Sequence, residues 1–160
     1  MPGIFLFLQK KVMVQRIQTV FMLVAAFLLG MLFTNPLAEI SAGAEVYVFN
    51  IKGIYKEAER VISSLPLLVF LSLILVLHVF VIFSYKNRIR QMRILTFTII
   101  LMLGLFGLFF YFSHATFEGE TVSYKISVAL PLVAAILDFL AIRNIGKDEA
   151  LVRSVDRLRK

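Results

Sequence analysis

The sequence predicts an all-α membrane protein, a bundle of four transmembrane helices joined by short loops. Residues 17–38, 61–85 and 94–117 contain no Asp, Glu, Lys or Arg, and residues 126–142 contain only Asp138. These lengths match the roughly 20 apolar residues that a helix needs to cross the ~30 Å hydrocarbon core of a bilayer. Charged residues make up 17% of the chain, whereas a soluble domain carries about 25%.

The second apolar stretch argues most directly against a soluble bundle. Residues 65–83 read LPLLVFLSLILVLHVFVIF and are apolar on every helical face. A helix on the outside of a soluble bundle carries polar residues on its solvent face at every turn. The shortage of charge is therefore the pattern of a membrane protein, and we expect a single domain over residues 1–160.

The distribution of basic residues predicts the orientation of this domain. We expect the spans at about residues 17–38, 62–85, 94–113 and 122–142, followed by a cytoplasmic tail at residues 143–160. Thirteen of the 17 Lys and Arg residues lie before the first span, between the second and third, or in the tail. Because cytoplasmic loops retain Lys and Arg, both termini are expected in the cytoplasm.

The first span also has features of a signal peptide. Basic residues precede it, and Ala42-Gly43-Ala44 resembles a cleavage site. The apolar region of a signal peptide usually runs ~7–15 residues, and this one is longer. We therefore favour an uncleaved helix; cleavage would leave three spans, with the tail on the same side as before.

The two outer loops carry strand-like sequence. Residues 45–55 read EVYVFNIKGIY, which is rich in β-branched and aromatic residues and has Gly53 as a turn signal. In the second loop, residues 113–125, strand-like residues flank a central acidic pair. Two structures fit this pattern: a small β-patch over the outer end of the bundle, or irregular loops with residues 56–64 extending the second helix.

Composition excludes several kinds of site. The chain has no cysteine, which excludes disulfides and thiolate chemistry. A metal site needs further ligands beside a histidine, and the two histidines, His78 and His114, lie towards opposite sides of the expected bundle. The net charge of +7 follows from the basic flanks of the spans. We therefore expect no metal, no cofactor and no nucleic-acid partner.

Asp138 is the strongest candidate for a functional residue. An acid within a span is costly and usually faces the protein interior or a water-filled cavity. At helical spacing Asp138 shares a small, polar face with Ser127, Pro131, Ala134 and Ala141, which suits close helix packing. Asp138 is either a proton or ion relay or a structural acid bonded to its neighbours near the cytoplasmic interface, and we favour the second.

The expected partners of Asp138 lie on the first span. Arg16, Gln18 and Thr19 begin that helix on the cytoplasmic side, at the expected depth of Asp138, and offer hydrogen-bond donors. These four residues form the candidate buried polar cluster. His78 has apolar neighbours at helical spacing and is expected to be a packed, neutral side chain.

The tail at residues 143–160 is expected to form an amphipathic helix. Glu149 with Arg153, and Asp156 with Lys160, are acid-before-base pairs at i, i+4. Such a helix lies on the membrane interface, binds a partner, or is a solvated extension of the fourth span. The candidate interface residues are Leu151, Val152, Arg153, Val155, Asp156, Arg157 and Leu158.

The two ends of the chain resemble those of a known family. The start reads MVQRIQTV at residues 13–20, and the end reads YKIS at 124–127, AIR at 141–143 and KDEALVRSVDRLR at 147–159. In these segments the chain is similar to an uncharacterised family of four-span bacterial membrane proteins, a domain of unknown function. The resemblance implies a multi-pass protein of the bacterial inner membrane and supplies no catalytic residues. Residues 1–12 precede it and are expected to be an extension from an upstream start codon.

Three classes of function fit these observations. The first is a non-enzymatic structural or accessory protein that recruits a protein partner through its tail. The second is a small oligomeric transporter or channel that uses Asp138. The third, a membrane enzyme, would need several polar residues at one depth. We expect the first class, with no catalytic residue, and with the lipid bilayer, a protein partner and further copies of the chain as partners.

Overall fold

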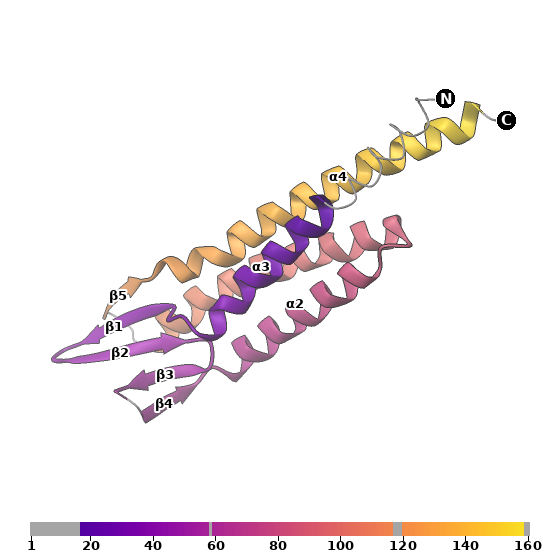
Figure 1. Ribbon diagram of the computed structural model, residues 1–160. Coiled ribbons are helices and arrows are strands. Elements are labelled where there is room, and N and C mark those ends of the chain that lie inside the picture. The colour runs from indigo at the N-terminus through magenta and orange to yellow at the C-terminus, as the bar shows by residue number, and fades with distance from the viewer. Residues whose placement is uncertain (1–16, 58, 117–119, 159–160) are drawn as a thin grey trace.

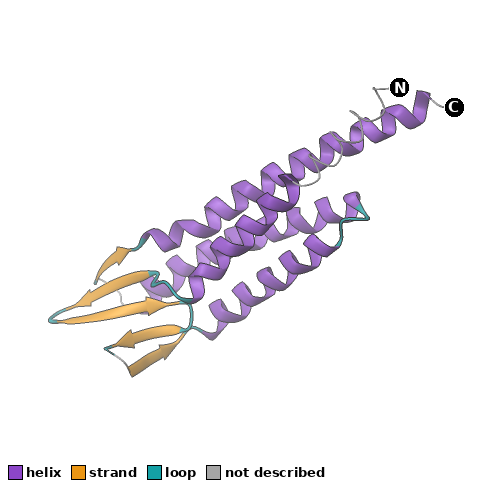
Figure 2. Cartoon of the chain, in the orientation of Figure 1, coloured by secondary structure: helices purple, strands orange, loops and turns teal. Residues whose placement is uncertain are grey.

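A computed structural model describes residues 17–57, 59–116 and 120–158. The helices run side by side in a bundle, and the strands lie together at one end of it (Figure 1; Figure 2). The three long helices are α2 (Leu65–Phe83), α3 (Arg88–Thr116) and α4 (Leu130–Leu158), the last preceded by the 3-10 turn η2 (Ile126–Ala129). Within the described residues, three segments are long and apolar enough to cross a membrane: Leu65–Phe83, Arg88–Ala115 and Ile126–Val152.

The first described helix, Ile17–Phe33, is shorter than the other three. It ends in the 3-10 turn η1 (Met31–Phe33). Two side chains just beyond the helix, Thr34 Oγ1 and Asn35 Nδ2, donate hydrogen bonds to the carbonyl of Met31 at 3.1 and 2.9 Å. The backbone N–H groups of Thr34 and Asn35 donate to the same carbonyl, so side chains and backbone together cap the helix end, and Pro36 then keeps the chain extended into the sheet.

Five antiparallel strands form the sheet, in the order β4-β3-β2-β1-β5. Four come from the first outer loop: β1 (Ala38–Ala42), β2 (Glu45–Asn50), β3 (Gly53–Lys56) and β4 (Glu59–Ser63). The fifth, β5 (Thr121–Tyr124), comes from the second outer loop and pairs with β1, with Ala38 opposite Tyr124. Ser113 Oγ at the end of α3 lies 2.8 Å from Tyr124 Oη, which ties this edge of the sheet to the bundle.

The prediction of an all-α fold is wrong, because both outer loops form strands. One side of the sheet is apolar and buried on the end of the bundle, with Ile40, Phe49 and Ile54 all at most 1% exposed. Glu45 and Val46 are exposed. Of the two alternatives left open for the loops, the β-sheet is the one that forms, and residues 59–63 are a strand and not an extension of the second helix.

Three expected boundaries change for the same reason. Residue 38, residues 62–63 and residues 121–124 belong to strands, although hydropathy placed most of them within spans. A short strand next to a span and the end of the span itself have similar composition, so hydropathy alone does not separate them. At the other end, α4 continues without a break to Leu158, so the expected tail helix is the C-terminal part of the fourth helix.

The interior of the bundle contains two apolar clusters. The larger one lies towards the sheet and includes Leu71, Ile74, Met102 and Ala134. The smaller one lies towards the opposite end and consists of Met22, Val81, Leu95, Ala141 and Ile145. The outward faces of the helices are also apolar: Phe27, Val76, Ile100 and Ile136 are more than half exposed. Such surfaces suit a hydrocarbon surrounding.

Candidate functional site

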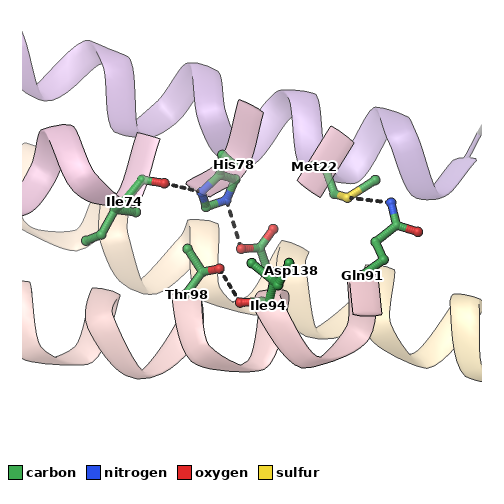
Figure 3. A network of polar contacts seen from close by, with 7 residues as sticks. All are labelled: Met22, Ile74, His78, Gln91, Ile94, Thr98 and Asp138. Atoms are coloured by element: carbon green, nitrogen blue, oxygen red, sulfur yellow. Dashed lines mark hydrogen bonds and ion pairs between the residues drawn. The ribbon is translucent and has the colours of Figure 1, made fainter. Parts of the chain in front are cut away.

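A polar layer lies between the two apolar clusters. It consists of His78 on α2, Thr98 on α3 and Asp138 on α4, and all three are 0% exposed. Along each helix these residues fall between members of the larger cluster and members of the smaller one. Figure 3 shows the three side chains among the helices. The layer therefore has apolar packing on both sides along the bundle axis.

The imidazole of His78 contacts two acceptors. Its Nδ1 lies 3.1 Å from the carbonyl oxygen of Ile74, and its Nε2 lies 2.9 Å from Asp138 Oδ2 (Figure 3). A carbonyl oxygen only accepts hydrogen bonds, so Nδ1 must carry a proton. This fixes the ring orientation and leaves Nε2 to interact with the carboxyl group.

The 2.9 Å contact between His78 Nε2 and Asp138 Oδ2 is short enough for the two groups to share one proton. If it resides on nitrogen, an imidazolium donates to a carboxylate; if it resides on oxygen, a carboxylic acid donates to a neutral imidazole. The pair has no net charge in either arrangement. Burial of an unpaired charge costs several kcal/mol or more, so the neutral pair is the arrangement that this apolar interior tolerates.

Asp138 depends on His78 for its orientation. The carboxyl Oδ1 is buried and has no hydrogen-bond partner among the described residues. The nearby hydroxyl of Thr98 donates to the carbonyl of Ile94 at 2.6 Å, so its proton is committed within its own helix. Loss of the imidazole would therefore leave both carboxyl oxygens without a donor.

A second polar level lies beyond the smaller apolar cluster, near the turn between α2 and α3. Gln91 Nε2 donates to the carbonyl of Val81 at 3.2 Å and contacts Met22 Sδ at 3.7 Å. Gln18 Nε2 donates to Asp148 Oδ2 at 2.7 Å. The Gln18 bond joins the first helix to α4, and the Gln91 bond joins α3 to α2. Both lie at the end of the bundle away from the sheet.

The structure separates the residues of the candidate polar cluster. Asp138 pairs with His78, whereas Gln18 pairs with Asp148, ten residues or about 15 Å further along α4. Thr19 is half-buried, and Arg16 lies outside the described residues. Asp138 and Gln18 therefore occupy two different levels of the bundle.

The candidate interface residues lie in the last two turns of α4. Leu151 is 62% exposed and Val152 is half-buried. The helical backbone continues through the remaining residues to Leu158. The side chains of Arg153, Val155, Asp156, Arg157 and Leu158 lie outside the described part of the structure.

The sequence pattern did not identify His78 as the partner of Asp138. The signal was present on α2, where Leu71, Ile74, His78 and Val81 recur at steps of three and four and are all 0% exposed. A histidine on the buried face of one span and an acid on the small-residue face of another are natural partners. To decide whether Asp138 pairs with His78 or with the first helix, one must know which helix faces pack against each other.

The solvent-exposed parts of the sheet carry ordinary surface ion pairs. Lys56 pairs with Glu45, and the hydroxyl of Tyr47 donates to Glu45 at 2.7 Å. The hydrogen bond from Lys56 lowers the pKa of Glu45 below its ordinary value. Lys125 Nζ lies 2.8 Å from Glu39 Oε1. Exposed pairs of this kind contribute little to stability, and among the described residues no three His, Asp or Glu side chains are grouped to hold a metal ion.

Comparison with known proteins identifies a family and no activity. A family model described as Domain of unknown function (DUF4293) matches residues 14–158. The resemblance to an uncharacterised family is thereby confirmed. A search of the curated proteins gives no match. Any function for the chain has to be argued from its own geometry.

Proposed function

Because the chain belongs to the DUF4293 family, whose description assigns no activity, we propose a function from the geometry of the bundle. The protein is a non-enzymatic accessory protein of the bacterial inner membrane that binds a protein partner through the C-terminal part of α4. It crosses the membrane four times, with the sheet outside and both termini in the cytoplasm.

Apolar outer faces and the basic residues support this placement. Three helices have the length and composition of spans, and the Ile17–Phe33 helix packs within the same bundle through Met22, Ala25 and Leu29. Among the described residues, most Lys and Arg lie at the end of the bundle opposite the sheet or beyond it. The positive-inside rule places that end in the cytoplasm.

The burial of the polar layer argues against a catalytic role for His78 and Asp138. A catalytic group has to reach substrate, with its partners within hydrogen-bond distance of the reacting atoms. His78 and Asp138 are 0% exposed and lie between two apolar clusters. Among the described residues, the sheet region holds two ion pairs, Glu45 with Lys56 and Glu39 with Lys125, and both are at the surface.

The observation that carries the proposal is the length of α4. Gly146 packs beside Met92 near the start of α3, yet α4 continues to Leu158, so its last turns project beyond the turn between α2 and α3 (Figure 1). Leu151 is exposed on this projecting segment. An amphipathic helix that leaves the bundle is suited to dock in a groove of another protein.

Site-specific photocrosslinking in native membranes tests the proposal. A photoreactive residue at Leu151 should give a discrete protein adduct, whereas the same residue at Ile136, which is equally exposed on the spanning part of α4, should not. Replacement of Ala150 by Asp should remove the Leu151 adduct. If Leu151 gives no adduct, or if both positions give the same one, the partner-binding role is wrong.

A small oligomeric transporter or channel is the second candidate, and the His78–Asp138 pair is the observation in its favour. Two groups that exchange a proton lie in one layer, as in proton relays within membranes. The apolar clusters on both sides weaken this candidate. Proton flux into proteoliposomes that is lost in Asp138→Asn would establish it over the accessory role.

A further inference from the structure

The turn between α2 and α3 concentrates positive charge. Lys86, Arg88, Arg90 and Arg93 lie within eight residues, and residues 60–117 contain no Asp or Glu. Lys86, Arg90 and Arg93 are exposed, and Arg88 is half-buried. The charge is therefore uncompensated within these two helices and available to an external anion.

Arg90 is the most firmly held of these basic residues. Its Nε donates to Ser84 Oγ at 2.9 Å, and its Cζ lies 5.8 Å from the ring centroid of Phe80, within range of a cation–π contact. No described residue accepts a hydrogen bond from its two Nη groups. The guanidinium is thus oriented by α2 while four of its five N–H donors remain free.

The turn that carries Arg90 is itself fixed. Asn87 Oδ1 accepts from the backbone N–H of Arg90 at 3.2 Å, and the N–H of Asn87 donates to the carbonyl of Ser84 at 3.1 Å. Gln91 donates to the carbonyl of Val81 from within the interior. A preorganised donor group binds an anion with a smaller loss of conformational entropy.

An exposed apolar stripe runs the length of α2 and ends beside Arg90. The stripe comprises Leu65, Val69, Leu73, Val76, Val79, Phe80 and Phe83, which are 46–75% exposed. From Val76 to Phe83 it covers about 10 Å of helix, a length that suits part of one leaflet of a ~30 Å hydrocarbon core. Phe80 belongs both to this stripe and to the Arg90 contact.

We infer that Arg90 and the α2 stripe bind one anionic phospholipid. The phosphate accepts from the free Nη groups of Arg90, and an acyl chain lies along Val76, Val79 and Phe83. Arginine suits this role because its planar fork matches a phosphate oxygen pair. The stripe favours a lipid over a soluble phosphate ester, since only a lipid covers the apolar surface that adjoins the charge.

Native mass spectrometry of the full-length protein tests this site. The protein is stripped of lipid in a neutral detergent and incubated with phosphatidylglycerol and phosphatidylcholine of identical acyl chains, and the adducts of each are counted. Wild type should retain phosphatidylglycerol preferentially. Arg90→Gln should lower that preference about fivefold, the contribution typical of one basic residue near an anionic lipid.

Two further variants distinguish a specific lipid site at Arg90 from a general effect of the protein's positive charge. Ser84→Ala keeps every charge but frees the Arg90 side chain, so it should lower the preference by a smaller factor. Lys52→Gln removes one exposed charge at the sheet and should leave the preference unchanged. If Arg90→Gln unfolds, the Ser84→Ala variant tests the site alone. An unchanged preference for phosphatidylglycerol in Ser84→Ala would then contradict the lipid site, because the site needs Arg90 to be held in place.

Three results would overturn the inference. These are an unchanged lipid preference in Arg90→Gln, an equal loss in Lys52→Gln, and displacement of the lipid by millimolar glycerol phosphate, which would indicate a soluble ligand. The inference rests on the proposed membrane location but not on the partner of α4 or on the orientation. A negative lipid-binding result in detergent would therefore contradict the lipid site and leave the proposed partner of α4 and the proposed orientation untouched.

Discussion

His78 Nε2 lies 2.9 Å from Asp138 Oδ2, and this contact joins two helices that are not each other's main neighbours. Among the labelled helices, α2 and α4 each pack mainly against α3. The contact therefore links α2 and α4 directly across the interior of the bundle. Because the pair has no net charge, it supplies this link without placing an unpaired charge in an apolar surrounding.

Removal of either partner should be more harmful than removal of both. Asp138→Leu leaves His78 Nε2 unpaired, and His78→Leu leaves the carboxyl group without a donor. Each should lower stability in detergent by about 1–2 kcal/mol, the upper range for polar contacts between membrane helices. The double variant should lie within about 1 kcal/mol of wild type, since replacing both polar partners by apolar groups is often nearly neutral.

Thermal unfolding of the four proteins measures this coupling. Asp138→Asn serves as the conservative control, because its amide donates to the neutral imidazole and should preserve the link. Stability losses that simply add in the double variant would show that the two side chains do not act as a pair.

The protonation of His78 Nδ1 should be insensitive to the state of the carboxyl group. The carbonyl of Ile74 accepts from this nitrogen, so Nδ1 should carry a proton in wild type and in Asp138→Asn alike. Nitrogen NMR of the 15N-labelled histidine should show a protonated Nδ1 in both proteins and an unprotonated Nε2 in the variant. A protonated Nε2 with an unprotonated Nδ1 in either protein would contradict the geometry.

The sequence predicted the helices well because hydropathy reports the environment of a whole segment. The charge-free stretches at residues 61–85 and 94–117 contain most of α2 and α3. Asp138 could be singled out for the same reason, since a lone acid in an apolar stretch needs a buried partner. Its burial follows from the small residues at Ala134 and Ala141, which share its face.

The partner of Asp138 and the strand pairing of the sheet could not be deduced from hydropathy. Pairing of Asp138 with His78 depends on how α2 and α4 are rotated about their axes, which is a property of the packed bundle. The pairing of β5 with β1 joins segments about 80 residues apart, and no local pattern encodes such a contact. The strand-like sequence of residues 45–55 favoured strands but gave no register.

Gly53 should be intolerant of a side chain. A Cβ at this position would lie 2.5 Å from the carbonyl oxygen of Ile62 on β4, and the residue has φ of +158°. Gly53→Ala should therefore push β3 and β4 apart and lower the free energy of unfolding by more than about 1 kcal/mol. Gly107→Ala is the matched control, because nothing lies within 4 Å of the added carbon and alanine favours the helix.

Thermal unfolding in detergent and trypsin sensitivity of the sheet distinguish these two variants. Gly53→Ala should show earlier cleavage at Lys56 and Arg60, while cleavage in Gly107→Ala should follow wild type. Equal behaviour of the two variants would mean that the close approach of β3 and β4 is not maintained in the protein.

Cysteine labelling should place the sheet and the end of α4 on opposite sides of the membrane. The chain has no cysteine, so a single introduced thiol reports without background. Ser41 on β1 and Ala150 on α4 are both exposed, and both accept a cysteine with little change in volume.

In intact cells a membrane-impermeant maleimide should label Ser41→Cys and not Ala150→Cys; after permeabilisation it should label both. The basic residues at the α4 end of the bundle are the physical reason, because they resist transfer across the membrane. Labelling of Ala150→Cys alone in intact cells would indicate the opposite topology, with the α2–α3 turn outside. Labelling of both variants in intact cells would show that the membrane does not separate the two sites.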